Sequence, residues 1–173
     1  PRVHEGKLRC DNEAGELRKS FKVLRLRQDI EAKFTFKGPS EERAGGVLSR
    51  KEIEFSVGNF EAAKEFLELL GFVPVVFYEK YRTTYEFLGV HIMLDELPYG
   101  TFVEIEGEDI ETLQKAANLL GLNWNAMVRA GYHALFERIT EKYNLEYGQL
   151  SFEALKSITA TAEDFGITYS DIN

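Results

Sequence analysis

The sequence predicts an α+β fold in which an antiparallel β-sheet curls into a barrel and helices pack on its outside. Two segments carry an apolar stripe with helical spacing, at Phe60–Leu70 and Ile110–Leu120. The predicted strands are numerous enough for the sheet to close into a barrel, which also removes exposed sheet edges. The strands with the clearest apolar-polar alternation are Val23–Arg27, Lys33–Lys37, Arg50–Phe55 and Thr101–Glu106.

Further elements continue the same pattern. We expect a third, longer helix at Trp124–Tyr143. The two shorter helices end at Gly71 and Gly121 in the related phrases LELLGF and ANLLGL, and each follows a Glu-x-Glu strand, which indicates a weak internal repeat. Gly38-Pro39 and Gly45-Gly46 predict a loop after the second strand. Additional strands are expected at Val75–Tyr78, Thr83–Leu88 and Val90–Leu94.

With 173 residues the chain can form one domain with its own core. We expect a barrel domain at 1–147 and a C-terminal extension at 148–173, with a short helix at Phe152–Ile158. The 44 % hydrophobic content excludes a disordered chain, and the sequence lacks the run of roughly 20 apolar residues that a membrane helix needs. The net charge of −8 argues against a nucleic-acid-binding surface.

The cysteine count and the N-terminal residues bear on location. Cys10 is the single cysteine, which excludes a disulfide framework, and Pro1-Arg2-Val3-His4-Glu5 lacks the apolar core of a signal peptide. We therefore expect a cytoplasmic location. Separately, we expect a monomer or homodimer that binds neither a membrane nor nucleic acid.

One face of the predicted sheet is charged along most of its length. Strand side chains alternate between two faces, so each segment can be divided into a charged and an apolar side. The apolar side, which includes Leu26, Ile53, Phe55, Leu94 and Val103, must be covered by the helices. The charged side carries Arg25, Arg27, Lys33, Thr35, Lys37, Arg50, Glu52, Glu54, Lys80, Arg82, His91, Met93, Asp95, Glu104 and Glu106.

This charged face allows two interpretations. In an open sheet it would lie in water, where cross-strand ion pairs contribute little. In a closed barrel it would line the interior, where so many cations are costly to dehydrate without a ligand or water. Arginine and lysine in that number suit a polyanion such as a phosphate chain. Carboxylates in the same cavity suit Mg²⁺ or Mn²⁺, which bind a few carboxylates together with phosphate oxygens.

Five sequence motifs occur in a specific order. They are Leu24-Arg25-Leu26-Arg27, Phe36-Lys37-Gly38-Pro39, Arg50-x-Glu52-x-Glu54, Glu79-Lys80-Tyr81-Arg82, and Leu94-Asp95-Glu96 followed by Gly100-x-Phe102-Val103-Glu104-Ile105-Glu106. In this order and spacing, over roughly Val3 to Phe136, the chain resembles the CYTH superfamily of triphosphate tunnel metalloenzymes. Within it, the chain is similar to class IV adenylate cyclases and thiamine triphosphatases.

The resemblance implies a closed eight-stranded antiparallel tunnel that binds a triphosphate-bearing small molecule with Mg²⁺ or Mn²⁺. Position by position, it implies metal binding by Glu5, Glu104 and Glu106, and a supporting acidic pair at Glu52 and Glu54. It implies catalytic roles for Lys80 and Asp95. The implied phosphate-binding residues are Lys7, Arg25, Arg27, Lys37, Arg50, Lys80 and Arg82.

The first strand departs from the family pattern. The family begins with Glu-x-Glu-x-Lys, whereas this chain has Val3-His4-Glu5-Gly6-Lys7, so the first carboxylate is missing. The stretch from Lys7 to Arg25 is also too short for the helix and additional strand that usually lie there. Either the protein is degenerate in this region or the sequence omits residues there, and we expect the second.

Three functions remain open at this point. The first is metal-dependent hydrolysis of a phosphoanhydride in inorganic, thiamine or nucleoside triphosphate. The second is a class IV adenylate cyclase that converts ATP into cyclic AMP and pyrophosphate. The third is a non-catalytic polyphosphate-binding module, motivated by the missing first carboxylate. The first two differ in which nucleophile reaches which phosphate.

Overall fold

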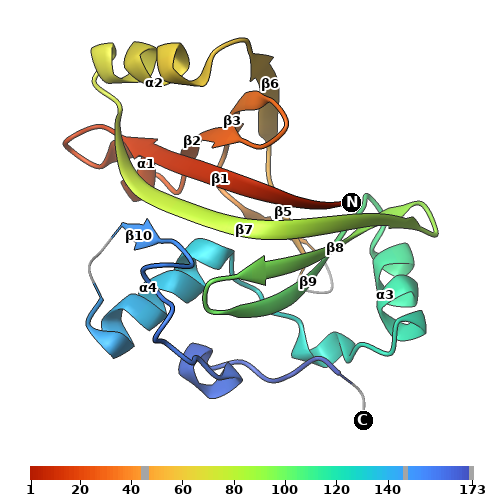
Figure 1. Ribbon diagram of the computed structural model, residues 1–173. Coiled ribbons are helices and arrows are strands. Elements are labelled where there is room, and N and C mark those ends of the chain that lie inside the picture. The colour runs from red at the N-terminus through yellow and green to blue at the C-terminus, as the bar shows by residue number, and fades with distance from the viewer. Residues whose placement is uncertain (44–46, 146–147, 172–173) are drawn as a thin grey trace. The chain divides into compact units, whose positions relative to one another are not determined.

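The computed structural model describes residues 1–43, 47–145 and 148–171 (Figure 1). The chain divides into two compact units. The N-terminal unit comprises His4–Lys80 and Gly148–Ala154, and the C-terminal unit comprises Pro1–Val3, Tyr81–Tyr147 and Leu155–Asn173. The expected boundary at residue 147, between a barrel domain and a C-terminal extension, lies outside the described residues and stays a prediction. The Gly45-Gly46 part of the expected loop also lies outside the described residues.

The N-terminal unit is a sheet with strand order β6-β3-β2-β1-β7, in which β6, β3, β2 and β1 pair antiparallel. Helix α2 packs against β2. The strand β10 (Gln149–Leu150) joins the first half of β7 in parallel. The elements are β1 (Arg2–Asp11), α1 (Glu16–Lys19), β2 (Val23–Gln28), β3 (Ala32–Lys37), β4 (Glu41–Glu42), β5 (Leu48–Ser49), β6 (Glu52–Val57), α2 (Phe60–Leu69) and the start of β7 (Val73–Phe87).

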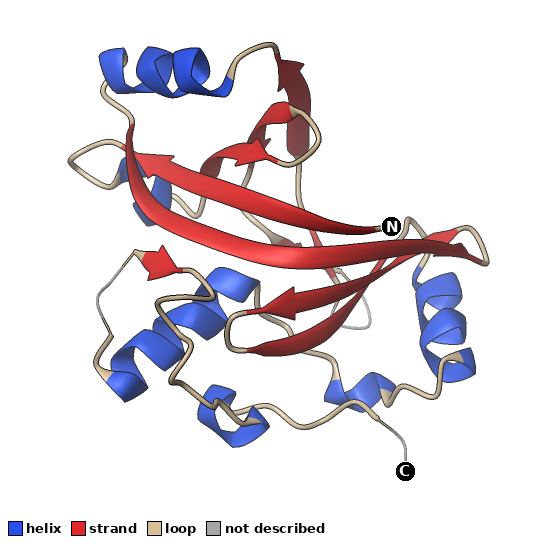
Figure 2. Cartoon of the chain, viewed as in Figure 1, coloured by secondary structure: helices blue, strands red, loops and turns tan. Residues whose placement is uncertain are grey.

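The C-terminal unit is built on the second half of β7, followed by β8 (Val90–Leu97) and β9 (Gly100–Glu106) in antiparallel order (Figure 2). Helix α3 (Ile110–Leu119) packs on β8 and β9. The short 3-10 helix η2 (Trp124–Ala126) leads to α4 (Tyr132–Tyr143), which packs against the 3-10 helix η3 (Ala162–Phe165) near the C-terminus.

The predicted α+β class with a mostly antiparallel sheet is confirmed. Hydrogen bonds among the described residues do not close the sheet into a barrel, because β6 and β9 each have one paired neighbour. The sheet is also not purely antiparallel, since β10 pairs with β7 in parallel.

Three elements differ from expectation. The strands expected at Val75–Tyr78 and Thr83–Leu88 form one strand, β7, because the residues between them contain no glycine or proline and continue the extended pattern. The helix expected at Trp124–Tyr143 is interrupted, because Gly131 is extended (ψ 159) and α4 begins only after it. The helix expected at Phe152–Ile158 is wrong, since 152–157 form turns.

The helices cover the apolar face only in part. Leu26 and Ile92 are buried, at 0 % and 4 % exposure. By contrast, Ile53 and Phe55 on β6 keep 46 % and 56 % of their surface exposed, and Leu94 and Val103 are similarly open. In the N-terminal unit the reason is that α2, which has ten residues, packs against β2 rather than against β6. The expectation of complete cover is therefore wrong.

The two strand-helix pairs have matching ends. Asn59 caps α2 by accepting from the Ala62 N–H, and Asp109 caps α3 by accepting from the Thr112 N–H. Each helix is followed by a left-handed glycine, Gly71 with φ 84 and Gly121 with φ 71. These caps agree with the repeat predicted from sequence. No helix among the described residues is long and apolar enough to span a membrane.

Candidate functional site

The charged strand residues form two clusters, one in each unit. We call the first the Glu5 cluster; it consists of Glu5, Lys7, Arg25, Arg27, Thr35, Lys37, Arg50, Glu52, Glu54 and Lys80. We call the second the Arg82 cluster; it consists of Arg82, Asp95, Glu104 and Tyr132. Every predicted site residue except Glu106 belongs to one of these two clusters, and Glu106 lies on β9 two residues beyond Glu104.

The centre of the Glu5 cluster is a buried carboxylate surrounded by cations. Lys7 Nζ donates to Glu5 Oε2 at 2.5 Å, Lys80 Nζ lies 3.8 Å from the same oxygen, and Arg27 Nη1 lies 3.9 Å from Oε1. Glu5 and Lys7 share a face because they are two apart on β1, and Lys7 pairs in register with Arg27. Glu5, Lys7 and Lys80 are 5 %, 3 % and 2 % exposed.

A relay of hydrogen bonds crosses the next strands. Arg25 Nη2 donates to Thr35 Oγ1 at 3.1 Å, and the Thr35 hydroxyl donates to Glu54 Oε2 at 2.9 Å. Arg27 Nη2 donates to Glu54 Oε1 at 3.1 Å. These contacts follow from the register, which sets Arg25 opposite Thr35 and Thr35 opposite Glu54. Arg25 Nε is buried and has no acceptor among the described residues.

The outer part of the cluster pairs Lys37 with Glu52. Lys37 Nζ donates to Glu52 Oε1 at 2.8 Å, and Arg50 Nε donates to the same oxygen at 3.0 Å. Burial, reinforced by the nearby charge of Arg25, lowers the pKa of Lys37. Burial by itself would raise the pKa of Glu52, but the hydrogen bonds and charges of Lys37 and Arg50 lower it overall. Cations therefore dominate the local potential.

The balance of buried charge in this cluster is positive. Lys7, Arg25 and Lys80 are buried cations, and Glu5 is the buried carboxylate beside them. Charges removed from water need a counter-charge and hydrogen-bond partners, and a buried donor without an acceptor costs about 1–3 kcal/mol. A polyanion would supply both the charge and the acceptors. The cluster is chemically suited to bind phosphate groups.

The Arg82 cluster is built on a cross-strand pair. Arg82 on β7 lies opposite Asp95 on β8 and binds it in a bidentate manner, with Nε to Oδ1 at 2.6 Å and Nη2 to Oδ2 at 2.5 Å. Nη2 also donates to Glu104 Oε2 on β9 at 2.5 Å. Asp95 is 1 % exposed. The Tyr132 hydroxyl of α4 donates to Asp95 Oδ2 at 2.7 Å.

The carboxylates of β9 fit a hard divalent cation. Glu104 and Glu106 point to one face of the strand, and both are exposed. Among the described residues, no group of three His, Cys, Asp or Glu side chains is arranged to hold a metal ion. Mg²⁺ nevertheless binds through one or two protein carboxylates when a substrate phosphate and water supply the other oxygens. Glu104 and Glu106 are therefore the candidate carboxylates for a divalent metal, and its identity as Mg²⁺ or Mn²⁺ stays a prediction.

Sequence reasoning missed Tyr132. It lies far from Asp95 in the sequence, in a segment that the sequence predicted only as a packing helix, so nothing in its spacing indicated the contact. Thr35 was placed on the charged face by alternation, but its part in linking Arg25 to Glu54 was not foreseen.

The connection between β1 and β2 is short and lies entirely within the described residues. β1 spans Arg2–Asp11, and the fully described stretch between β1 and β2 holds the four-residue helix α1 and no further strand. The Asp11 carboxylate orders this stretch by accepting from the backbone N–H groups of Asn12, Leu17 and Arg18. The short connection is therefore a structured turn around a buried acid.

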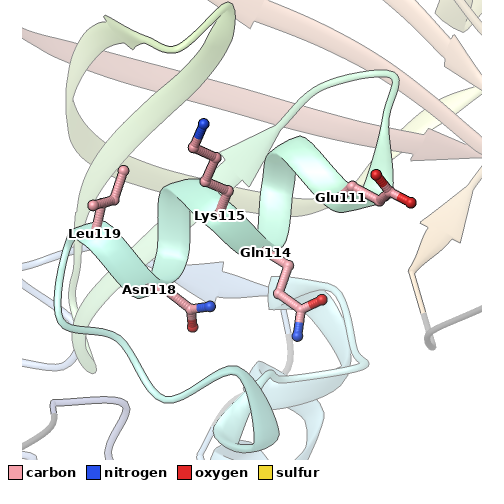
Figure 3. A pocket seen from close by; sticks show the side chains of 5 residues that line it. All are labelled: Glu111, Gln114, Lys115, Asn118 and Leu119. Carbon is pink, nitrogen blue, oxygen red and sulfur yellow. The ribbon is translucent and has the colours of Figure 1, made fainter.

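A hollow beside α3 lies outside both clusters (Figure 3). Its lining side chains all come from α3, and they are Glu111, Gln114, Lys115, Asn118 and Leu119. None of these residues belongs to the predicted site.

Comparisons with known proteins agree with the motifs. The CYTH domain profile matches residues 11–129. The structure is similar to PH1819 from Pyrococcus horikoshii OT3, with 28 % identity, 82 % of this chain and 85 % of that chain covered, and a TM-score of 0.65. A search among curated proteins found no match.

Two further solved structures share the fold. One is HpAC1 from Hippeastrum, an adenylyl cyclase candidate with a dominant triphosphatase activity; it is 19 % identical over 97 % of this chain and 87 % of that chain, with a TM-score of 0.54. The other is an adenylate cyclase candidate from Vibrio parahaemolyticus, 22 % identical over 69 % of this chain and 68 % of that chain, also with a TM-score of 0.54.

Proposed function

Since the chain belongs to the CYTH domain family, we propose that it is a divalent-metal-dependent enzyme that hydrolyses a phosphoanhydride bond in triphosphate-bearing small molecules. Inorganic triphosphate and thiamine or nucleoside triphosphates are the substrate class. The predicted resemblance to this family is confirmed by the profile match. The closed barrel, the cytoplasmic location and the monomeric or homodimeric state remain predictions.

The observation that carries the proposal is the unpaired donor of a buried arginine. Arg25 Nε is buried and lacks an acceptor among the described residues, although the same guanidinium reaches Thr35 through Nη2. A buried donor without an acceptor costs free energy, so a ligand that supplies an acceptor at this position would bind favourably. A phosphate oxygen is a strong, charged acceptor for arginine. The excess of buried cations around Glu5 supports the same ligand.

The residue roles follow the chemistry of each cluster. In the N-terminal unit, the cations Lys7, Arg25, Arg27, Lys37, Arg50 and Lys80 bind phosphate oxygens and Lys80 also assists the reaction, while Glu5, Glu52 and Glu54 keep these side chains in place. Glu5 is additionally proposed as a metal ligand. Preorganised cations of this kind stabilise the charge that develops on a transferred phosphoryl group.

In the C-terminal unit, Arg82 binds phosphate and Asp95 orients Arg82 and is the proposed catalytic acid or base. Glu104 and Glu106 would hold Mg²⁺ or Mn²⁺. When bound, the metal would neutralise phosphate oxygens and lower the pKa of a bound water.

A class IV adenylate cyclase is the second candidate, and it rests on the motif resemblance. It would use the ribose 3′-hydroxyl of ATP in place of water and release pyrophosphate. A non-catalytic polyphosphate-binding module is the third. It is favoured by the way that Glu5, Asp95 and Glu104 are each engaged by a basic side chain.

One experiment separates the three. The protein is incubated with tripolyphosphate, thiamine triphosphate or ATP, with Mg²⁺, Mn²⁺ or EDTA, and phosphate, pyrophosphate and cyclic AMP are measured. Metal-dependent phosphate release supports the hydrolase. Cyclic AMP with pyrophosphate would establish the cyclase instead. If tripolyphosphate binds but no product forms, both enzyme proposals fail and the binding module stands.

Arg25→Gln tests the observation on which the proposal rests. Loss of hydrogen bonds to a charged ligand should weaken tripolyphosphate binding about 10- to 100-fold by calorimetry. Arg18→Gln is the matched control, because it removes the same charge from an exposed position on α1. Equal affinities for the two variants would refute the role of Arg25.

A further inference from the structure

We propose that Tyr132 is a positioning residue whose buried hydroxyl fixes Asp95 and, through Asp95, holds the guanidinium of Arg82 in the orientation that binds phosphate. This inference rests on the proposed function, because it takes Arg82 as a phosphate ligand. It also assigns a structural role to the segment after residue 155, because that segment packs on α4, the helix that carries Tyr132.

Acidic side chains hold the guanidinium of Arg82 in one orientation. Two edges of its guanidinium are held, with Nε and Nη2 on the two oxygens of Asp95 and Nη2 also on Glu104. The remaining nitrogen, Nη1, lies 3.1 Å from the sulfur of Met93. A thioether is a weak acceptor, whereas a phosphate oxygen is a strong one. Nη1 is therefore the group that a phosphate would take over.

The Asp95 side chain is held in position by neighbouring side chains. Its side chain has 0 % exposure, so water cannot hold it in place. The Tyr132 hydroxyl donates to Oδ2 at 2.7 Å, the same oxygen that receives Arg82 Nη2. Burial, with the charges of Glu104 and Asp95 adding to it, raises the pKa of Tyr132 far above its ordinary value. The shift favours the protonated phenol, which is the form that donates to Asp95.

Ring packing and a backbone hydrogen bond hold Tyr132 itself. Its ring packs edge-on against Phe102 of β9, with centroids 5.4 Å apart, and its backbone carbonyl accepts from the Tyr99 hydroxyl at 3.0 Å. Phe165 of η3 packs on both Phe102 and Tyr99. The Phe165 carbonyl in turn accepts from Arg138 of α4. The C-terminal segment thus closes an aromatic cluster around the helix start that carries the hydroxyl.

The test compares two Tyr→Phe variants on the same helix. Tyr132→Phe removes the hydroxyl that reaches Asp95 and keeps the ring in its aromatic cluster. Tyr143→Phe is the matched control, because its hydroxyl donates to a different carboxylate, Asp164 Oδ2, at 3.0 Å. We expect the KM for tripolyphosphate to rise about tenfold in Tyr132→Phe, as for a lost hydrogen bond to a charged group, with kcat within about threefold. Tyr143→Phe should keep the KM of the wild type.

A second measurement does not depend on turnover. The Nε–H resonance of Arg82, assigned by its loss in Arg82→Lys, reports how firmly the guanidinium is held on Asp95. Its exchange with water should be faster in Tyr132→Phe than in the wild type and unchanged in Tyr143→Phe. A merely structural role of the hydroxyl would lower the melting temperature without this difference.

The outcomes separate this inference from the proposed function. If the wild type neither binds nor hydrolyses any triphosphate, the proposed function fails, and the Arg82 exchange rate alone decides whether Tyr132 positions it. If the wild type is active but Tyr132→Phe matches it in KM and in Arg82 exchange, the inference is overturned. An equal rise in KM in both variants would also overturn it, because the cause would then be general loosening of α4.

Discussion

The buried carboxylate of Glu5 provides the sharpest stability prediction. Glu5→Gln keeps the shape of the side chain but removes its charge from among three cations, at 2.5 Å, 3.8 Å and 3.9 Å. At an effective dielectric constant of about 20, a pair at 2.5 Å interacts by roughly 7 kcal/mol and a pair near 3.8 Å by roughly 4 kcal/mol. The variant also escapes the desolvation penalty of the carboxylate, so the net loss should match that of a broken buried ion pair, about 3–5 kcal/mol.

Urea unfolding followed by circular dichroism measures this loss. The protein is held in EDTA and a phosphate-free buffer, so that neither metal nor ligand compensates the cations. With a slope of about 2 kcal/mol per molar urea, the midpoint should fall by about 2 M. Adding tripolyphosphate should raise the midpoint more in Glu5→Gln than in the wild type, because the ligand then supplies the missing negative charge.

The control is Glu31→Gln, which removes the charge of an exposed glutamate paired with Lys33 at 3.0 Å. It should leave the midpoint unchanged, as is usual for surface ion pairs. The reasoning is refuted if Glu5→Gln is as stable as this control. It is also refuted if tripolyphosphate stabilises Glu5→Gln and the wild type equally.

Three further predictions concern other residues. Glu106→Gln should abolish metal-dependent turnover while the circular dichroism spectrum stays that of the wild type; unchanged turnover would remove Glu106 from the site. Lys142, with the Thr161 N–H and the Tyr143 hydroxyl, lowers the pKa of Asp164. The ionised Asp164 therefore stabilises the folded protein fully above its pKa in the unfolded chain, about 3.9, and this stabilisation is lost as the pH falls below that value. Asp164→Asn should therefore flatten the decline of the melting temperature below pH 4, and an unchanged slope would contradict this. Burial raises the pKa of the Cys10 thiol to about 11, so iodoacetamide at pH 8 should modify it only after unfolding in urea, as mass spectrometry can check; rapid modification of the folded protein would count against its burial.

Local sequence patterns were enough to predict several features of the structure. Alternation along β2 and β3 put Arg25, Arg27 and Lys37 on one face, because side-chain direction in a strand depends only on position along the chain. The ends of α2 and α3 followed from the glycines after them, because few other residues adopt a left-handed conformation at low cost. The family motifs likewise lie within single strands and their turns.

Contacts between residues that are distant in the sequence could not be predicted from local patterns. The family resemblance singled out Glu5 and Lys7, but it could not show that Lys80 of β7 also approaches Glu5. The length of β7 was also missed, although the residues between its two expected halves contain no glycine or proline that would end a strand. The break before α4 was missed because helix propensity alone favours a continuous segment through Met127.

The sequence by itself determined which side chains are charged, which face of each strand they occupy, and the family to which they belong. Only the tertiary structure decided which charges are buried, which donor of Arg25 lacks an acceptor, and which tyrosine reaches Asp95. The physical reason is that facing is set by backbone geometry within a few residues, whereas burial and hydrogen-bond partners depend on strand register and on helices that pack from distant parts of the chain.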